Sequence, residues 1–475
     1  MKKNISHIGR IPLKAGLLSA MLLSASYLIL PAVTSAQTIS AGVYHSLAIC
    51  NDNTANAWGD NTYGQLGDGT NSTNNFPVPV SSLTGIIAVS GGGGGLSSLA
   101  LKNDGTVWAW GLNVDGQIGN GTNTDSNIPL QVSSLTGIIA IAGGGSHSVA
   151  LKNDGTVWAW GNNSTGQLGN GSSSNSNVPV LVNGLTGIIA IAGGGGFSLA
   201  LKNDSTVWAW GNNWYGQLGN GTNTNPGNIP VQVSFLTGII AIAGGVEHSL
   251  ALKNEGTVWA WGKNNYGQLG NGTATYCITA PVQVSSLNGI IAIAAGDYHS
   301  LALKNDNIVW AWGNNNQGQL GNGTNTESWV PVQVNSLTGI TAIAGGVYHS
   351  LAVKNDGRVW TWGGVASNSN VIPVQVIGLC QAANAVNNII EKEAEINVFP
   401  NPSSNTVTIK FSSSSKGKLL LTIKDELGQT VYSENKKDFS GDYVNTIYLS
   451  KQPKGIYFVE MILGNERRTR KIIIE

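Results

Sequence analysis

The sequence of 475 residues carries little charge: Asp, Glu, Lys and Arg make up 11% of it, and the two signs balance to a formal net charge of zero. After residue 33, no run approaches the roughly 18 apolar residues that a membrane-spanning helix needs. No segment of useful length shows the 3.6-residue apolar spacing of an amphipathic helix. These absences favour an all-β chain without a later membrane span.

The charge is unevenly distributed along the chain. Residues 37–379 hold 8 Lys and Arg against 14 Asp and Glu, whereas residues 380–475 hold 13 against 11. A protein that binds DNA or RNA needs a cationic stripe to neutralise the phosphates. Because the large segment is mildly acidic, we expect no nucleic acid as its main partner.

Cysteine is also scarce, with Cys50, Cys277 and Cys380 scattered along the chain. A secreted chain can oxidise one pair, but three distant cysteines do not make a disulfide framework. Cys50 stands at a repeat position that is Lys in other copies. We therefore interpret Cys50 as sequence drift rather than as part of a site.

The N-terminus has the three parts of a secretory signal peptide. A basic start without acids is followed by an apolar stretch over residues 17–33 and by small residues before Gln37. A membrane anchor is the alternative, but Ser and Pro interrupt the apolar stretch and no basic cluster follows it. We predict a signal peptide over residues 1–36, cleaved between Ala36 and Gln37.

The strongest signal is an internal repeat of about 50 residues, anchored on a Trp-Gly pair. One unit reads GIIAIAGGVEHSLALKNEGTVWAWGKNNYGQLGNGT, followed by a variable stretch and APVQVSSL. We expect the anchor tryptophans to form a structural core between the units. They are Trp58, Trp110, Trp160, Trp210, Trp261, Trp312 and Trp362.

Each unit is expected to form four short strands. IIAIA is a continuous apolar run, typical of a strand buried on both faces, whereas HSLALK and TVWAW alternate. The Asn-Asp-Gly turn between them suits a hairpin, and the proline that opens PVQV suits an edge strand or the start of a strand. Such a unit cannot bury both faces alone. Residues 37–379 are therefore expected to close into a seven-bladed β-propeller of four-stranded blades.

The pattern G-x-x-HSLALK-N-D-G-x-VWAWG-x-N-x-x-GQLG-x-G-T resembles the repeat of the regulator of chromosome condensation family over residues 37–379. Kelch propellers have a similar period but lack the HSLAL and GQLG blocks. The resemblance implies a seven-bladed propeller. It also implies two activities of family members: nucleotide exchange on a small GTPase in eukaryotes, and inhibition of β-lactamases by some bacterial relatives.

The composition changes near residue 394, after a linker predicted over residues 380–393. Strand-like runs split by turn residues then predict a small Ig-like β-sandwich over residues 394–475. This block resembles the C-terminal sorting domain of the bacterial type IX (Por) secretion system, with an ordinary accessory sandwich as the alternative. The resemblance implies export across the outer membrane, with the type IX secretion machinery as partner. It is carried by Pro400, Asn401, Pro402, Gly428, Gly455, Tyr457 and Lys471.

The repeats show no arrangement that predicts catalysis. Five histidines share one repeat position, where two other copies have Ser97 and Phe197. Equivalent points on packed sheets lie about 10 Å apart, too far to share one metal ion at about 2 Å. The recurring Asn-Asp carboxylates suit turn formation. We expect no catalytic, cofactor or metal site, and hydrogen-bonded structural histidines at His45, His147, His248, His299 and His349.

Function is therefore expected where the copies differ, in the loops before the shared histidine position and before GQLG. Exposed aromatic residues on loops often anchor binding surfaces, although drift in solvent loops is the alternative. The candidate binding residues are Tyr44, Tyr63, Trp214, Tyr215, Tyr266, Tyr298 and Tyr348. The seventh repeat lacks the GQLGNGT block, which we interpret as trimming where the tail leaves, with a docking notch as the alternative.

The expected function is a secreted or surface-displayed binding module, monomeric and not an enzyme, for an extracellular protein or glycan. Two alternatives come from the family resemblance. One is inhibition of a secreted enzyme such as a β-lactamase. The other is guanine nucleotide exchange, against which export argues. A lyase or glycosidase has no residue set in its support.

Overall fold

The computed structural model describes residues 39–92, 95–224, 227–365, 368–380, 397–400, 402–403, 406–425, 428–463 and 466–475. The predicted signal peptide and its cleavage site at Ala36 and Gln37 lie outside the described residues, as do Asn401 and the predicted linker apart from Cys380. The chain divides into two compact units, Met1–Gln381 and Ala382–Glu475. None of the described residues forms a helix long and apolar enough to cross a membrane.

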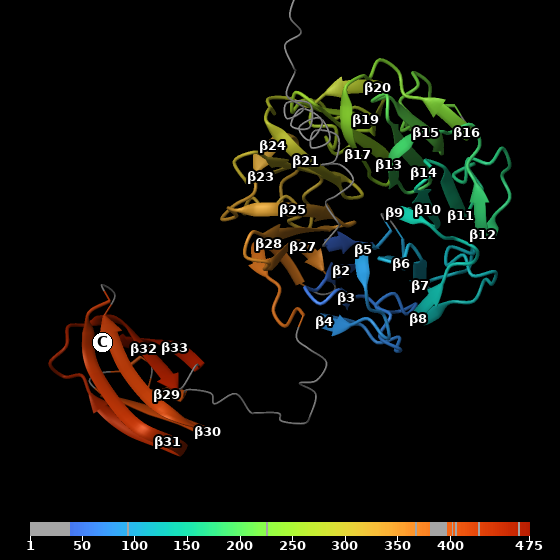
Figure 1. The fold of residues 1–475 in the computed structure, drawn as a ribbon. Helices are drawn as coiled ribbons and strands as arrows, with labels where there is room; N and C mark the ends of the chain where they lie inside the picture. Colours follow the sequence, from blue (N-terminus) through green and yellow to red (C-terminus); the bar gives the residue numbers. More distant parts are fainter. Residues whose placement is uncertain are drawn as a thin grey trace, which may run out of the picture. The chain divides into compact units, whose positions relative to one another are not determined.

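The first unit is a ring of seven four-stranded antiparallel sheets (Figure 1). This confirms the predicted seven-bladed propeller of four-stranded blades. Each blade is built from four consecutive strands, so no strand is exchanged between the ends of the chain. The ring closes where the first strand of blade 1 contacts the first two strands of blade 7.

The strand bounds repeat from blade to blade. Blade 1 has β1 (Ile39–Ala41), β2 (His45–Ile49), β3 (Ala55–Gly59) and β4 (Asn74–Pro79). Blade 2 has β5 (Ile86–Ser90), β6 (Ser97–Lys102), β7 (Val107–Gly111) and β8 (Ser126–Gln131). Blade 3 has β9 (Ile138–Gly143), β10 (His147–Lys152), β11 (Val157–Gly161) and β12 (Ser176–Leu181). Blade 4 has β13 (Ile188–Gly193), β14 (Phe197–Lys202), β15 (Val207–Gly211) and β16 (Gly227–Gln232).

The remaining blades follow the same order. Blade 5 has β17 (Ile239–Gly244), β18 (His248–Lys253), β19 (Val258–Lys263) and β20 (Cys277–Gln283). Blade 6 has β21 (Ile290–Ala295), β22 (His299–Lys304), β23 (Val309–Gly313) and β24 (Ser328–Gln333). Blade 7 has β25 (Ile340–Gly345), β26 (His349–Lys354), β27 (Val359–Val365) and β28 (Asn368–Gln375).

Two details of the blades differ from the sequence prediction. The first strand is not buried on both faces, because these strands line a central cavity of about 360 Å³, and Ile240 is 39% exposed. The fourth strand does not begin at its proline. In β8, Pro129 lies inside the strand. The proline is tolerated there because the outer strand has no neighbour on its far side.

The glycines after the first strand are required by close approach of the blades. A Cβ on Gly143 would lie 2.6 Å from the Cα of Gly92 in the preceding blade. One residue later, a Cβ on Gly144 would lie 2.1 Å from Cε1 of His147. Both distances are shorter than real contacts allow, so these positions accept only glycine without movement of a neighbour.

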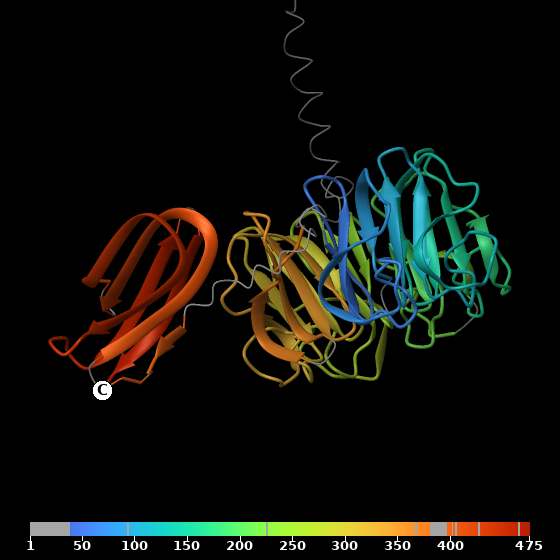
Figure 2. The ribbon, with the colours of Figure 1, turned by 90° about the horizontal axis from the view of Figure 1, so that it is seen from below.

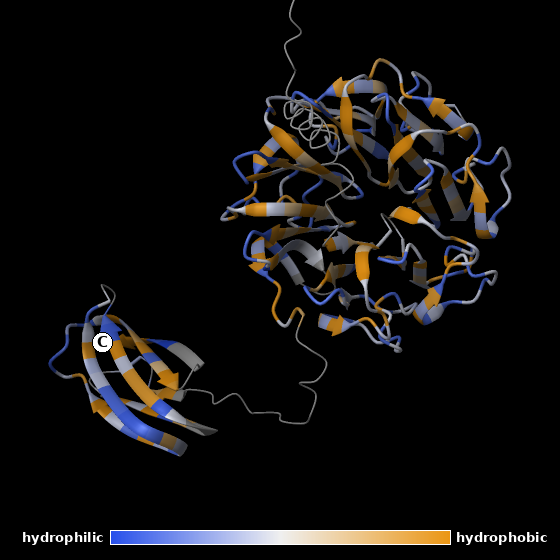
Figure 3. Ribbon diagram, in the orientation of Figure 1, coloured by the Kyte–Doolittle hydropathy of each residue, from blue (hydrophilic) through white to orange (hydrophobic). Residues whose placement is uncertain are grey.

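The anchor tryptophans lie in the cores between blades. Trp261 of blade 5 is fully buried and packs with Leu199 and Leu201 of blade 4, and the same contact recurs around the ring. Figure 3 shows the corresponding hydrophobic bands on the strands and hydrophilic residues on the connecting loops. Aromatic side chains bury large areas, so this stripe contributes strongly to the stacking of the blades.

The interpretation of Cys50 as drift is wrong. Cys50, which follows β2 in blade 1, forms a disulfide with Cys380, just beyond β28 of blade 7, across a sequence separation of 330 residues. Cys277 is a free, half-buried thiol. Comparison with the lysine at this position in other copies does not reveal the pairing, because no local pattern shows that the two ends of the ring meet. The disulfide covalently closes the ring at the junction of its first and last blades.

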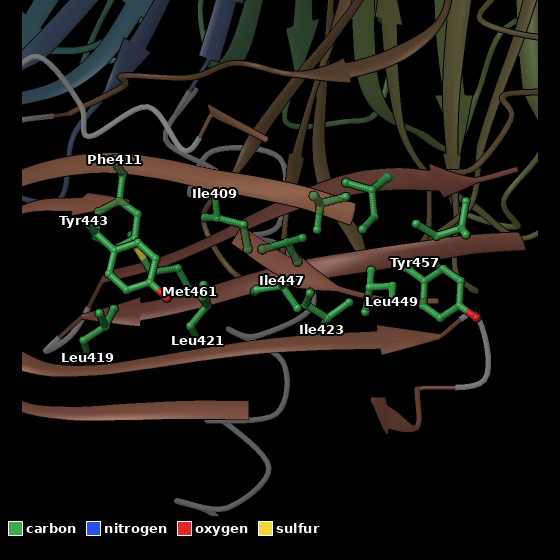
Figure 4. Packing of buried hydrophobic residues seen from close by; sticks show 14 of the residues in the cluster. Ile409, Phe411, Leu419, Leu421, Ile423, Tyr443, Ile447, Leu449, Tyr457 and Met461 are labelled. Carbon is green, nitrogen blue, oxygen red and sulfur yellow. The ribbon is translucent and has the colours of Figure 1, made fainter. Parts of the chain in front are cut away.

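The second unit is all-β, as predicted. It has β29 (Asn397–Phe399), β30 (Thr406–Asp425), β31 (Thr430–Tyr448), β32 (Gly455–Leu463) and β33 (Glu466–Ile474). The long strands β30 and β31 pair with register shifts between Ser413 and Leu419. Residues from both halves of β30, such as Ile409 and Leu421, share one core with Tyr443 (Figure 4). The five strands thus form one sheet whose two halves enclose a common core.

The residues that carry the sorting-domain resemblance lie at strand ends and on the last two strands. Pro400 and Pro402 follow β29. Gly428, with φ of 81°, lies in the turn before β31. Gly455 begins β32, where Tyr457 is buried, and Lys471 pairs with Phe458 between β33 and β32.

Candidate functional site

The five histidines form cross-blade hydrogen bonds rather than a metal site. In each, Nε2 lies 2.8–3.0 Å from the hydroxyl of a serine in the next blade. The pairs are His45–Ser98, His147–Ser198, His248–Ser300, His299–Ser350 and His349–Ser46, the last across the ring closure. The described residues contain no group of three or more His, Cys, Asp or Glu placed to hold a metal ion.

The hydrogen-bond pattern also fixes the histidine tautomer. The Ser300 hydroxyl donates to the carbonyl of Gln268 in the GQLG motif at 2.8 Å, and Trp312 Nε1 donates to the same carbonyl at 2.9 Å. Since the serine proton is used in this way, the Nε2–H of His248 must donate to the serine oxygen. Burial lowers the pKa of His248 to about 4, so at neutral pH the ring is uncharged and carries its proton on Nε2.

The turn carboxylates lie away from the loops that vary between copies. Asp104, Asp154 and Asp204 each accept hydrogen bonds from the backbone and hydroxyl of the Thr two residues later. Each also lies within 3.5 Å of the lysine that ends the second strand. These contacts make the turn, and no acid–base pair is formed among them.

Strand order places both sets of candidate loops on one face of the ring. In blades of four consecutive antiparallel strands, the first-to-second and third-to-fourth connections emerge at the same end (Figure 2). We call this the tyrosine face. The second-to-third turns and the connections between blades form the opposite side, the turn face. This face assignment is what the sequence alone left open.

Five of the predicted aromatic residues meet on the tyrosine face. Tyr44 of blade 1 stacks on Tyr348 of blade 7, with ring centroids 6.1 Å apart. Tyr266 of blade 5 contacts Tyr298 of blade 6 edge to face at 5.6 Å. Tyr215 of blade 4 instead contacts a residue that sequence reasoning missed, Tyr276, at 5.3 Å. The loops of five consecutive blades thus place six tyrosines, in three contacting pairs, on one face.

Lys263 joins two of these pairs. Its ammonium lies 4.5 Å from the ring centroid of Tyr215 and 5.5 Å from that of Tyr298, and it forms an ion pair with Glu247 at 2.5 Å. Although burial lowers the pKa of Lys263, the hydrogen bond and charge of Glu247 outweigh it and raise that pKa. We call the six tyrosines with Lys263 the tyrosine arc.

The sequence contained a signal for both missed residues. Lys263 interrupts a repeat position that is Asn in several copies, and Tyr276 stands in the variable stretch of the same blade. Trp214 and Tyr63 lie in equivalent loops but outside the arc. Trp214 is 62% exposed, and the backbone amide of Tyr63 donates to the Gln65 side chain at 2.9 Å.

Replacing Lys263 by Met is expected to destabilise the propeller by about 1 kcal/mol. The change removes the ion pair and two cation–π contacts and leaves Glu247 half-buried without its partner. Lys253→Met is a matched control, because Lys253 also lies over an aromatic ring, Trp259, at 4.8 Å but pairs with exposed Glu255 on the turn face. Urea unfolding of both variants measures the difference, and equal effects would contradict a special role for Lys263.

The net charge of the propeller is concentrated on the tyrosine face. Its connections contain seven acids, and one base, Lys263, ends β19 at this face. The turn-face connections also contain seven acids, but seven bases lie there or at the adjoining ends of the second strands. The seven acids of the tyrosine face are Asp60, Asp68, Asp115, Asp125, Glu247, Asp297 and Glu327. The face that carries the aromatic residues is therefore also the acidic face of the ring.

Comparison with known families gives matches to both units. An RCC1-like domain matches residues 92–371, and regulator of chromosome condensation (RCC1) repeats match residues 36–65 and 56–97. A secretion system C-terminal sorting domain matches residues 397–475.

Relatives and solved structures agree with the propeller match. The ultraviolet-B receptor UVR8 of Arabidopsis thaliana is 33% identical over 297 residues, 61% of this chain and 68% of that protein. The E3 ubiquitin-protein ligase HERC2 of Mus musculus is 34% identical over 60% of this chain, which spans only 4% of HERC2. Human WBSCR16 aligns with a TM-score of 0.60 and 26% identity, over 67% of this chain and 86% of its own. Prp20p of Saccharomyces cerevisiae shares the fold, with a TM-score of 0.62 and 23% identity, over 74% of this chain and 90% of its own.

Proposed function

The chain belongs to the RCC1-like family of propellers, and we propose that it binds an extracellular protein or glycan through the tyrosine face. The sorting domain sends the chain through the type IX secretion system to the cell surface or the medium. A partner of the exported propeller is therefore sought outside the cell. The tyrosine arc is the single observation that supports this face as the binding surface.

The arc has the physical properties of an anchor surface. Tyrosine offers a large, rigid contact area and a polar hydroxyl at a low cost in side-chain entropy. Tyr44 is 40% exposed and Tyr276 is 62% exposed, so part of each ring remains free for a partner. The ring contacts and Lys263 hold the side chains in place before binding, which reduces the entropy lost in the complex.

The other features of the propeller favour binding over chemistry. The histidines are neutral and bonded within the ring, and the turn carboxylates serve their own loops. Inhibition of a secreted hydrolase is the alternative function, and a captured hydrolase is the outcome of the experiment below that would favour it.

Affinity capture from extracellular material tests the proposal. The full exported chain is compared with a variant in which Tyr44, Tyr276 and Tyr348 are replaced by Ala, and with Ile139→Ala as a matched control, since Ile139 is an exposed apolar residue at the start of β9, toward the turn face. We expect a protein or glycan that the wild type and the control retain and that the triple variant loses by at least tenfold. Retention by all three proteins would show that the tyrosine face is not the binding surface.

A further inference from the structure

Asp297 is a buried carboxylate at the rim of the tyrosine face. It lies in the connection between β21 and β22 of blade 6 and is only 6% exposed. Its backbone amide donates to Gly346 of blade 7 at 3.2 Å. Among the described residues its carboxylate has no hydrogen-bond donor and no ion-pair partner, and its oxygens are not among the unpaired atoms that are fully closed off from solvent. Buried carboxylates normally have such partners, because desolvating an unpaired charge is costly.

The surroundings of Asp297 disfavour its ionised form, which a cation would stabilise. Burial and then the like charge of Glu247 raise the pKa of Asp297 to about 8. The charge of Asp297 also acts on Tyr298 and Tyr348. Burial is the largest cause that raises the pKa of each tyrosine, and Asp297 is one of the further causes. The ammonium of Lys263 is paired with Glu247 at 2.5 Å. Glu247 therefore has a lysine partner, whereas Asp297 has none.

The equivalent position in the other blades shows that Asp297 is exceptional. It is occupied by Val43, Val246 and Val347 in three blades and by glycine in the other three. An aspartate in this apolar ring is not needed to build a blade. Because burial disfavours the ionised form of a carboxyl group, an aspartate at this position brings no gain to the free propeller.

From these contacts we infer that Asp297, together with Glu247, Tyr298 and Tyr348, receives a lysine or arginine side chain of a protein partner. This inference rests on the proposed function and names the partner class for the same face. Lys263 already shows how an ammonium sits here, between tyrosine rings and a carboxylate. The excess of acids on the face favours a basic partner over a neutral glycan.

Calorimetric titration of the full chain with N-acetyl-L-arginine amide and N-acetyl-L-lysine amide tests the site without knowledge of the partner. We expect saturable binding at pH 7 with a Kd of about 1 to 10 mM, typical of a single contact. Since the cation stabilises the ionised form of Asp297, binding should release a proton, seen as a dependence of the heat on the ionisation enthalpy of the buffer.

Asp297→Asn should weaken this binding at least tenfold and abolish the proton release. Asp306→Asn is the matched control, because Asp306 lies in the same blade on the turn face, and it should bind as the wild type does. Absence of saturable binding, or equal binding by Asp297→Asn, would overturn the inference. If the capture experiment still yields a partner in that case, the proposed function survives and only its basic character is refuted; if the wild type captures no partner, the proposed function itself fails.

Discussion

Replacing Cys50 and Cys380 together by Ser is expected to lower the free energy of unfolding of the propeller by about 4 kcal/mol. The disulfide joins residues 330 positions apart, and a cross-link over so long a loop strongly restricts the unfolded chain. It also lies at the junction where the first and last blades meet and where blade 7 lacks the GQLG block that provides hydrogen bonds between other blades. Thermal unfolding under non-reducing conditions measures the loss.

Cys277→Ser is the control for this experiment, because Cys277 is free, and it should unfold as the wild type does. Reducing agent should lower the midpoint of the wild type to that of the double variant and leave the double variant unchanged. The account of ring closure is wrong if the double variant and the wild type unfold at the same temperature.

Acid is expected to destabilise the propeller steeply between pH 6.5 and pH 4. Burial lowers the pKa of five histidines, to about 3 for His45 and His299 and to about 4 for His147, His248 and His349. An unfolded histidine titrates near 6.5, so in this window the unfolded chain binds more protons and stability falls as the pH falls. Within this window each histidine lowers the free energy of unfolding by about 1.4 kcal/mol for each pH unit of acidification.

Asp297 has the opposite effect on the pH dependence of stability. Its pKa is raised in the folded chain, to about 8, so between pH 8 and pH 4 the folded state holds one proton that the unfolded state lacks. The net uptake on unfolding is therefore about four protons. Urea unfolding at a series of pH values gives this number from the slope of stability against pH.

The chain itself provides a control for the acid effect. Blade 4 has Phe197 at the histidine position, fully buried in the same place. His147→Phe should therefore fold, although the missing hydrogen bond to Ser198 should lower its free energy of unfolding. Its unfolding in acid should take up one proton fewer than that of the wild type. A slope unchanged from the wild type would mean that His147 is not a buried neutral histidine.

The blades could be predicted because the same pattern of strands occurs in seven copies. The alternation in HSLALK and the Trp-Gly anchor each identify a strand and its buried face. Comparison of the copies resolves the strand assignments that are ambiguous in a single copy. The same comparison caused the error at Cys50, where the copy that differs carries the information. A disulfide between distant positions depends on ring closure, which no local pattern encodes.

The candidate site was only partly predictable. Loop aromatics such as Tyr44 and Tyr266 stand out against the repeat, but their pairing depends on which ends of neighbouring blades meet. Lys263 and Asp297 were visible as departures from the consensus, yet their roles come from burial and from the groups beside them. Neither property follows from sequence position alone.

The central claim is that the exported propeller binds its partner with the tyrosine face. Amide hydrogen exchange of the full chain, measured with and without the captured partner, tests it most directly. We predict new protection in the first-to-second and third-to-fourth connections of blades 4 to 7 and blade 1, around Tyr215, Tyr298 and Tyr348. Protection confined to the Asn-Asp turns of the opposite face, or to the sorting domain, would contradict the claim.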